Sequence, residues 1–216
     1  MARNHSPRAP AQPSPGGSPR FLLVVVALAG LVILGSGAFI VVALHGNTRG
    51  IAGTPLSSAV GGPFHLTDQD GKTVTDADLK GKWSLVYFGY THCPDACPTA
   101  LNDISIALDE LGPKRAAVRP VFITVDPERD TQEVLKSYVT SFDAPILALT
   151  GTPDEIAQAA KGYRVYYAKH PEVGGDYSMD HSSVIYVMDP QGRFTASFTQ
   201  ENSPEEIAER LKKLLA

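Results

Sequence analysis

An uncharged apolar stretch near the N-terminus constrains the organisation of this 216-residue chain more than any other feature. Residues 21–44 contain no charged side chain, and Ser36 is their only residue with a hydroxyl group. As a helix, these 24 residues are long enough to cross the hydrocarbon layer of a bilayer, which is roughly 30 Å thick. The stretch therefore predicts a single transmembrane helix that anchors the rest of the chain.

Basic residues flank this stretch unevenly. Arg3, Arg8 and Arg20 precede it, whereas only Arg49 follows it closely. Because Arg and Lys are enriched on the cytoplasmic side of membrane helices, the N-terminus is expected in the cytoplasm. The C-terminal domain is then exported, which places it in the periplasm if the membrane is a bacterial inner membrane.

The segments on either side of the apolar stretch have compositions that do not form a core. Residues 1–20 hold five prolines and are predicted to be a disordered cytoplasmic tail, and the Gly-, Pro- and Ser-containing residues 45–62 are predicted to be a flexible tether. A cleaved secretory signal is the alternative, with Val41-Val42-Ala43 as its cleavage pattern, but its apolar core usually has only about 7–15 residues. A mitochondrial transit peptide is disfavoured because the prolines would break its amphipathic helix.

Charge restricts the partners of the remaining chain. Four of the 19 basic residues lie in residues 1–50, which contain no acid, so 15 basic residues remain against 23 acids and residues 51–216 carry a formal charge of −8. An acidic domain lacks the basic surface that binds phosphate backbones, which argues against DNA or RNA as a partner. A cationic protein partner is favoured instead.

Hydrophobic periodicity predicts one α/β domain over residues 63–216. Strand-like runs alternate with helical periodicity, and an antiparallel hairpin precedes the last helix, which is the order of a thioredoxin-like sandwich with an added N-terminal hairpin. A capping box is expected to open the second helix at Asp130. The expected strands are 64–67, 72–75, 84–90, 119–125, 146–149, 183–188 and 194–198, and the expected helices are 99–111, 130–142, one opened by residues 152–155, and 204–215.

The only two cysteines of the chain, Cys93 and Cys97, directly follow the predicted strand 84–90. Pro98 suits the first position of a helix and disfavours helical angles at Cys97, so both sulfurs are expected in the loop and cap before that helix. Unpaired N–H groups there stabilise a thiolate, the form needed for metal ligation or nucleophilic attack. A plain structural disulfide is the alternative, but so short a loop gains little from a cross-link.

A third donor is sought among the histidines because two thiolates rarely complete a metal site. His181 is favoured because it lies at the entry to a predicted core strand, which in a thioredoxin-like sheet runs beside the dithiol loop. Asp180 is expected to orient its imidazole. His92 is disfavoured because neighbours in extended chain point opposite ways. His65 and His170 are expected on the surface, the latter in a solvated loop.

Three motifs occur along the chain in the order Phe88-Gly-Tyr-Thr-His-Cys-Pro-Asp-Ala-Cys-Pro98, Thr124-Val-Asp-Pro-Glu-Arg-Asp-Thr131 and Asp180-His-Ser182. In this order they resemble the Sco/SenC family of membrane-tethered copper chaperones, with a match over about residues 62–215. The resemblance implies a thioredoxin-like domain that binds copper through Cys93, Cys97 and His181 and serves assembly of the binuclear copper A centre of cytochrome c oxidase. The partners that it implies are the oxidase subunit carrying that centre, a thiol reductase and other copper chaperones.

Donor chemistry points to the same metal. Two thiolates and one imidazole form a soft site suited to Cu(I), and Cu(II) leads the divalent affinity order. Zinc is the competing metal that an experiment has to exclude, because two cysteines and one histidine with an open position also suit catalytic zinc. Three ligands leave room for an incoming one, so we expect exchange through a shared-ligand intermediate. Because ligation needs reduced sulfur, oxidation of the pair is expected to abolish copper loading.

Other interpretations of the same residues stay open. Cys93 and Cys97 as a redox-active pair would suit a thiol-disulfide oxidoreductase that reduces the acceptor cysteines without delivering copper, so enzymatic activity is undecided. A peroxiredoxin-like peroxidase is disfavoured because Thr91 lies two residues, not three, before Cys93. The roles of Asp95 and Met179 stay undecided, and Asp126, Arg129 and Asp130 are divided between turn formation and a role near the site.

Overall fold

The computed structural model of the chain describes residues 60–172 and 174–216. The tail and transmembrane helix predicted over 1–20 and 21–44 lie outside the described residues, as does the predicted tether up to residue 59. Within the described residues, no helix is long and apolar enough to cross a membrane.

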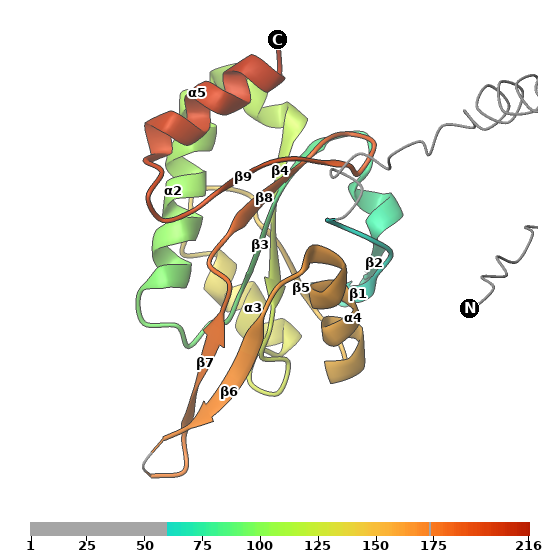
Figure 1. Cartoon of the computed structure of the whole chain (residues 1–216), viewed down its shortest axis with the longest axis vertical. Coiled ribbons are helices and arrows are strands. Elements are labelled where there is room, and N and C mark those ends of the chain that lie inside the picture. The colour runs from blue at the N-terminus through green and yellow to red at the C-terminus, as the bar shows by residue number, and fades with distance from the viewer. Residues whose placement is uncertain (1–59, 173) are drawn as a thin grey trace, which may run out of the picture. The chain divides into compact units, whose positions relative to one another are not determined.

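A seven-stranded mixed sheet forms the centre of the domain, in the order β2-β1-β5-β4-β3-β8-β9 (Figure 1). The three strands β5, β4 and β3 run parallel, while β1 and β8 pair antiparallel with β5 and β3. The predicted hairpins at both ends of the domain are confirmed. The strands are β1 (His65–Asp68), β2 (Thr73–Thr75), β3 (Trp83–Gly89), β4 (Val118–Thr124), β5 (Leu147–Thr150), β8 (Ile185–Met188) and β9 (Phe194–Phe198).

Helices cover both faces of this sheet. Phe88 of β3 packs on Tyr163 of α4, with ring centroids 5.3 Å apart. The next residue, Gly89, points to the opposite face, where it meets Cys97 of α2, because side-chain directions alternate along a strand. On that second face α2 and α5 pack against each other. The helices are α2 (Ala96–Glu110), α3 (Gln132–Val139), α4 (Pro153–Tyr163) and α5 (Pro204–Leu214), with short 3-10 helices η2 (Asp76–Leu79) and η3 (Gly112–Ala117).

Strand β3 runs through the core, and its residues 84–89 are all buried. This matches its sequence, a nearly continuous apolar run typical of a strand covered on both faces. Phe122 of β4 and Leu101 of α2 are also fully buried. The carboxyl end of β3 is therefore held rigidly, and the chain leaves it directly into the cysteine motif.

The predicted start of α4 at residues 152–155 is confirmed, and there Thr152 and Glu155 form a capping box in which each side chain accepts a hydrogen bond from the other's backbone N–H. The prediction for α3 is wrong by one residue. Its N-cap is Thr131, whose hydroxyl accepts a hydrogen bond from the N–H of Val134, and Asp130 turns into the interior instead. The local sequence could not show which of the neighbours Asp130 and Thr131 is the N-cap, because the buried partners of Asp130 lie elsewhere in the chain.

A second, two-stranded sheet was not predicted. Strands β6 (Tyr167–Pro171) and β7 (Tyr177–His181) form an antiparallel hairpin that projects from the main sheet (Figure 1). Most of β6 is exposed, so its sequence carries no alternation of apolar and polar residues. His170, expected in a loop, thus lies in a strand, although it is exposed as predicted.

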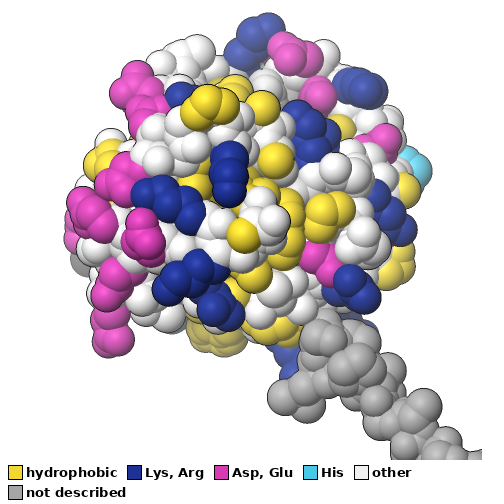
Figure 2. All heavy atoms as spheres, turned by 90° about the horizontal axis from the view of Figure 1, so that it is seen from above, with side chains coloured by type: hydrophobic (Ala, Val, Ile, Leu, Met, Phe, Trp, Pro, Cys, Tyr) yellow, Lys and Arg dark blue, Asp and Glu magenta, His cyan; other side chains and the backbone are white. Residues whose placement is uncertain are grey.

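Charged side chains of both signs lie on the surface of the domain (Figure 2). On the face shown in Figure 2, acidic and basic groups are interspersed with apolar and uncharged ones. The excess of acids in residues 51–216 is therefore not gathered into one continuous patch on that face.

Candidate metal centre

Three side chains from two distant parts of the chain converge at the carboxyl end of β3. The sulfurs of Cys93 and Cys97 and a ring nitrogen of His181 all lie within 4.8 Å of one another. Cys97 Sγ is 3.3 Å from His181 Nε2, and both cysteines are free thiols. The structure thus brings together the three side chains that the sequence analysis named as ligands.

Cys97 is the second residue of α2, and the prediction that it lies before the helix is wrong. The first helical hydrogen bond runs from the N–H of Thr99 to the carbonyl of Asp95, at 3.1 Å. Pro98 is tolerated because N–H groups of the first helical turn have no partner within the helix. The N–H of Cys97 donates to Cys93 Sγ at 3.3 Å, so the helix N-terminus still stabilises the Cys93 sulfur as expected.

Gly89 makes room for the Cys97 sulfur, a role that the sequence analysis missed. A Cβ atom at this position would lie 2.7 Å from Cys97 Sγ and 2.9 Å from Phe122 Cε2. Both contacts are too short for any side chain, so only glycine lets the sulfur pack directly on the end of β3. A glycine inside an otherwise bulky strand was the available signal, because it marks a close approach of another group.

The two sulfurs differ strongly in acidity. A hydrogen bond from Cys97, together with contacts with His181 and backbone N–H groups, lowers the pKa of the Cys93 thiol to about 3. The same interaction, together with burial, raises the pKa of the Cys97 thiol well above its usual range. At neutral pH the reduced, metal-free pair therefore holds one thiolate and one thiol, and a metal bound by both sulfurs displaces the Cys97 proton.

His181 ends β7 and is held between two tyrosines. The rings of Tyr87 and Tyr90 stand nearly perpendicular to the imidazole, each with its centroid 5.9 Å away. Its Nδ1 lies 3.4 Å from the carbonyl oxygen of Ser182. An Nδ1–H directed at that oxygen leaves the lone pair of Nε2 facing Cys97, which is the form that ligates a metal.

Asp180 does not orient His181, contrary to the prediction. Its carboxylate lies 2.8 Å from Nε2 of His170 on the exposed part of the hairpin. Asp180 and His181 are adjacent in β7, so their side chains point to opposite sides of the strand.

The second sequence motif, residues 124–131, makes hydrogen bonds to the β6–β7 hairpin that carries His181. Arg129 donates through Nε to Asp126 Oδ2 at 2.5 Å and through Nη1 to the carbonyl of Tyr177 at 2.9 Å. Tyr177 Oη in turn donates to Asp126 Oδ1 at 2.8 Å, and its ring centroid lies 3.6 Å from the Arg129 guanidinium carbon. These contacts tie β7 to the loop after β4, so the motif contributes to the site by fixing its surroundings.

The other histidine and acidic candidates lie outside the converging group. His92 is half exposed, with Nδ1 3.2 Å from Thr91 Oγ1, and His65 is exposed at the start of β1. Asp95 is exposed at the start of α2, 3.4 Å from Thr99 Oγ1. Met179 is buried in the core.

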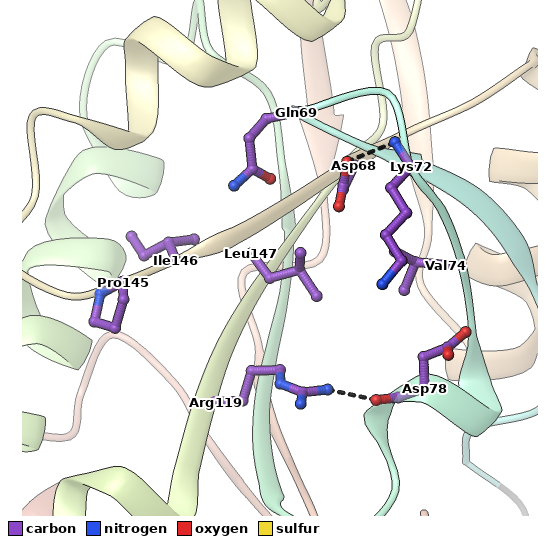
Figure 3. Close-up of a pocket in the computed structure, with 9 residues that line it drawn as sticks. All are labelled: Asp68, Gln69, Lys72, Val74, Asp78, Arg119, Pro145, Ile146 and Leu147. Carbon is purple, nitrogen blue, oxygen red and sulfur yellow. Dashed lines mark hydrogen bonds between the residues drawn. The ribbon is translucent and has the colours of Figure 1, made fainter.

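A cavity of about 480 Å³ lies at the other end of the parallel strands (Figure 3). Leu147 and Arg119, which line it, lie at or near the start of β5 and β4, whereas the cysteines follow the end of β3. Arg119 Nη1 donates to the carbonyl of Asp78 at 2.6 Å across its rim. This cavity is therefore separate from the cysteine and histidine group.

The fold and the converging group define a class of protein: an α/β domain with two sulfurs and one imidazole that could hold a soft metal ion. Residues 52–216 match the family model SCO1/SenC, and the chain belongs to this family. The resemblance inferred from the three sequence motifs is confirmed.

Curated relatives share the domain but are mostly longer. The chain is 43% identical over 157 residues to Protein SCO1 homolog 1, mitochondrial, of Arabidopsis thaliana, covering 72% of this chain and 47% of that protein. It is 43% identical over 155 residues to the SCO2-like protein RP587 of Rickettsia prowazekii, covering 71% of this chain and 76% of that protein. The chain spans about half the length of the plant relative and of yeast SCO1, of which 55% is matched.

Solved structures share the thioredoxin-like fold. Bradyrhizobium japonicum ScoI, solved with copper bound, is 53% identical with a TM-score of 0.68, and the match covers 72% of this chain and 99% of that one. Arabidopsis thaliana ScoI, also with copper bound, is 44% identical with a TM-score of 0.69, covering 72% of this chain and 97% of that one. In these solved relatives the domain therefore folds without the part of this chain that lies outside the match. The two sulfurs and one imidazole described here fit the copper that both relatives hold.

Proposed function

We propose that the chain is a membrane-anchored metallochaperone that binds copper through Cys93, Cys97 and His181. It delivers this copper to the binuclear copper A centre of cytochrome c oxidase. The observation that carries the proposal is the convergence of two sulfurs and one imidazole nitrogen within 4.8 Å. One relative of known structure, BsSco, 27% identical, is described as a member of the Sco family of cytochrome c oxidase assembly proteins.

The site suits a metal that is held and then released. Thiolate and imidazole donors favour Cu(I), and Cu(II) is the alternative cargo. Cys97 is fully buried, but Cys93 is partly exposed and gives an incoming ligand access to the metal. An acceptor cysteine can then bind copper before Cys93 releases it, so the metal passes through a shared-ligand intermediate.

A thiol-disulfide activity toward the acceptor cysteines is the second candidate function. The observation in its favour is the unequal pair, in which the Cys93 thiolate is the nucleophile and Cys97 is the neighbouring thiol. Cys93 attacks the acceptor disulfide and releases one acceptor thiolate. Cys97 then loses its proton, attacks the mixed disulfide and releases the second acceptor thiolate, leaving Cys93 and Cys97 joined.

The proposed location follows from the N-terminal sequence. Residues 21–44 span the bacterial inner membrane once, with residues 1–20 in the cytoplasm and residues 63–216 in the periplasm. The Rickettsia relative supports a bacterial setting. A thiol reductase and further copper chaperones are the other proposed partners, because an oxidising compartment would otherwise close the cysteine pair.

A transfer experiment tests delivery and separates the two functions. Reduced residues 51–216, loaded with one copper per molecule, are mixed in excess with the reduced, metal-free copper A domain of the oxidase subunit, and the copper that reaches this domain is measured at intervals after the two proteins are separated. We expect faster assembly than with the same copper supplied in bulk solution, and loss of that gain in His181→Ala. Equal rates from loaded protein and bulk copper would contradict delivery.

The redox candidate uses the same proteins with the acceptor oxidised. Metal-free, reduced residues 51–216 should reduce the acceptor disulfide, and His181→Ala should retain most of this rate because the electrons come from the cysteines. If His181→Ala retains both reduction and assembly of the centre, the protein is a dithiol reductase and the copper proposal fails.

A further inference from the structure

Asp130 joins the carboxyl ends of two strands through buried hydrogen bonds. Its side chain is fully buried, and its Oδ2 accepts from Thr124 Oγ1 at 2.5 Å. Its backbone carbonyl accepts from Thr150 Oγ1 at 3.1 Å. These contacts link the loop after β4 to the last residues of β4 and β5.

The same carboxylate also accepts hydrogen bonds from Thr91, in the loop that leads from β3 to the metal centre. Its Oδ2 accepts from the backbone N–H of Thr91 at 3.0 Å, and its Oδ1 accepts from Thr91 Oγ1 at 2.6 Å. Burial raises the pKa of Asp130, and the bonds from Thr124 and Thr91 oppose that rise. The nearby Asp126 carboxylate also raises this pKa, and the half-exposed His92 has its Nδ1 4.0 Å from Asp130 Oδ1.

Thr91 lies two residues before Cys93, in the turn that carries the first sulfur. The N–H of Cys93 closes this turn by donating to the carbonyl of Tyr90 at 3.3 Å. Cys97 is held differently, because it lies within α2 and packs on Gly89. The two sulfurs thus depend on separate supports, and the one under Cys93 runs through Thr91 to Asp130.

We propose that Asp130 is a positioning residue for the metal centre, which holds Cys93 Sγ at ligand distance from Cys97 and His181 by fixing Thr91. This inference rests on the proposed copper site and adds a residue that touches neither the metal nor its ligands. Metal–ligand distances tolerate only about 0.2 Å of variation, so a turn free to shift would weaken binding. Residues that orient ligands typically change metal affinity by about 10–100-fold when they are replaced.

Two isosteric substitutions separate positioning from general stability. Thr91→Val removes a hydroxyl bond to the Asp130 carboxylate, and Thr150→Val removes a hydroxyl bond to the Asp130 carbonyl, so each deletes one bond to the same residue. Asp130→Asn replaces one carboxylate oxygen, which accepts hydrogen bonds, by an NH₂ group that cannot accept them. Thr91→Ser keeps the hydroxyl that Thr91→Val removes. All are prepared in residues 51–216 and compared by thermal unfolding and by Cu(I) affinity in competition with a chelator.

We expect Thr91→Val and Asp130→Asn to lose at least tenfold in Cu(I) affinity, and Thr91→Ser to recover most of that loss. Thr150→Val should bind copper within about threefold of the wild type even though it unfolds at a lower temperature. Equal losses in Thr91→Val and Thr150→Val would show a merely structural role and overturn the proposal. So would wild-type affinity in Asp130→Asn.

A second readout needs no copper and keeps the two proposals distinguishable. In the reduced, metal-free protein, the pH at which alkylation of Cys93 reaches half its maximal rate should rise in Thr91→Val, because a displaced sulfur loses the N–H of Cys97 that stabilises its thiolate. Thr150→Val should react like the wild type. If the wild type binds no copper but this difference is seen, the proposed function fails and the positioning role stands. If the variants react alike, the positioning role fails whatever the copper affinity.

Discussion

Replacing Gly89 by alanine should damage the copper site through a single methyl group. The added Cβ would lie 2.7 Å from Cys97 Sγ, 2.9 Å from Phe122 Cε2 and 3.1 Å from Tyr87 Cε1. Ordinary contacts are about 3.5–4.0 Å, so the sulfur or the strand has to move by roughly 1 Å. Overpacking of this kind costs about 1–3 kcal/mol of unfolding free energy. A shift of that size also exceeds the tolerance of a metal–sulfur bond, so we expect copper affinity to fall about 10–100-fold.

The assay is chelator competition for Cu(I) with reduced residues 51–216, together with urea unfolding of the metal-free protein. Gly62→Ala is the matched control, because a Cβ there would meet only Gly162 Cα at 3.8 Å, an ordinary contact. The control should retain wild-type affinity and stability. Wild-type copper affinity in Gly89→Ala would refute the argument that the sulfur needs the space above this glycine.

Three further predictions follow from the same contacts. In the reduced, metal-free protein, alkylation of Cys93 should be nearly independent of pH from 5 to 8, because a pKa of about 3 leaves it a thiolate throughout, whereas a rate that rises tenfold per pH unit would contradict this. Tyr177→Phe should lower the unfolding free energy by about 1 kcal/mol and speed amide exchange in β6 and β7, because the bond to Asp126 is lost; unchanged exchange would show that this bond does not fasten the hairpin. Copper at 100 times its Kd should raise the Tm of the reduced domain by roughly 5–10 °C, and an equal rise after oxidation of the cysteines would contradict the redox gate.

Periodicity was sufficient to predict the main sheet and its helices. The buried run of β3 and the apolar face of α2 are long enough to be read from sequence, and residues 152–155 marked the start of α4. The β6–β7 hairpin could not be found in this way, because most of β6 faces solvent and has no apolar pattern. It is held instead by Arg129, whose partners lie 47 and 48 residues away in the chain.

The three proposed ligands were named from the sequence, but the residues that hold them in place were not. Cysteine spacing and the family motifs pointed to Cys93, Cys97 and His181, which the structure brings together. The surroundings depend on long-range packing that sequence does not show. Asp130 resembled a helix cap because caps are common for aspartate, but its partner Thr91 lies 39 residues earlier in the chain. Asp180 resembled a support for His181 only because the two are adjacent in sequence.

The most direct test of the copper site is the amount of copper bound per mole of reduced residues 51–216. Wild type, Cys93→Ser, Cys97→Ser and His181→Ala are compared in the presence of competing zinc. We expect one tightly held copper per wild-type domain, severe weakening in each variant, and no displacement by zinc. Stoichiometric binding that is indifferent to His181, or preference for zinc, would contradict a copper site built from two sulfurs and one imidazole.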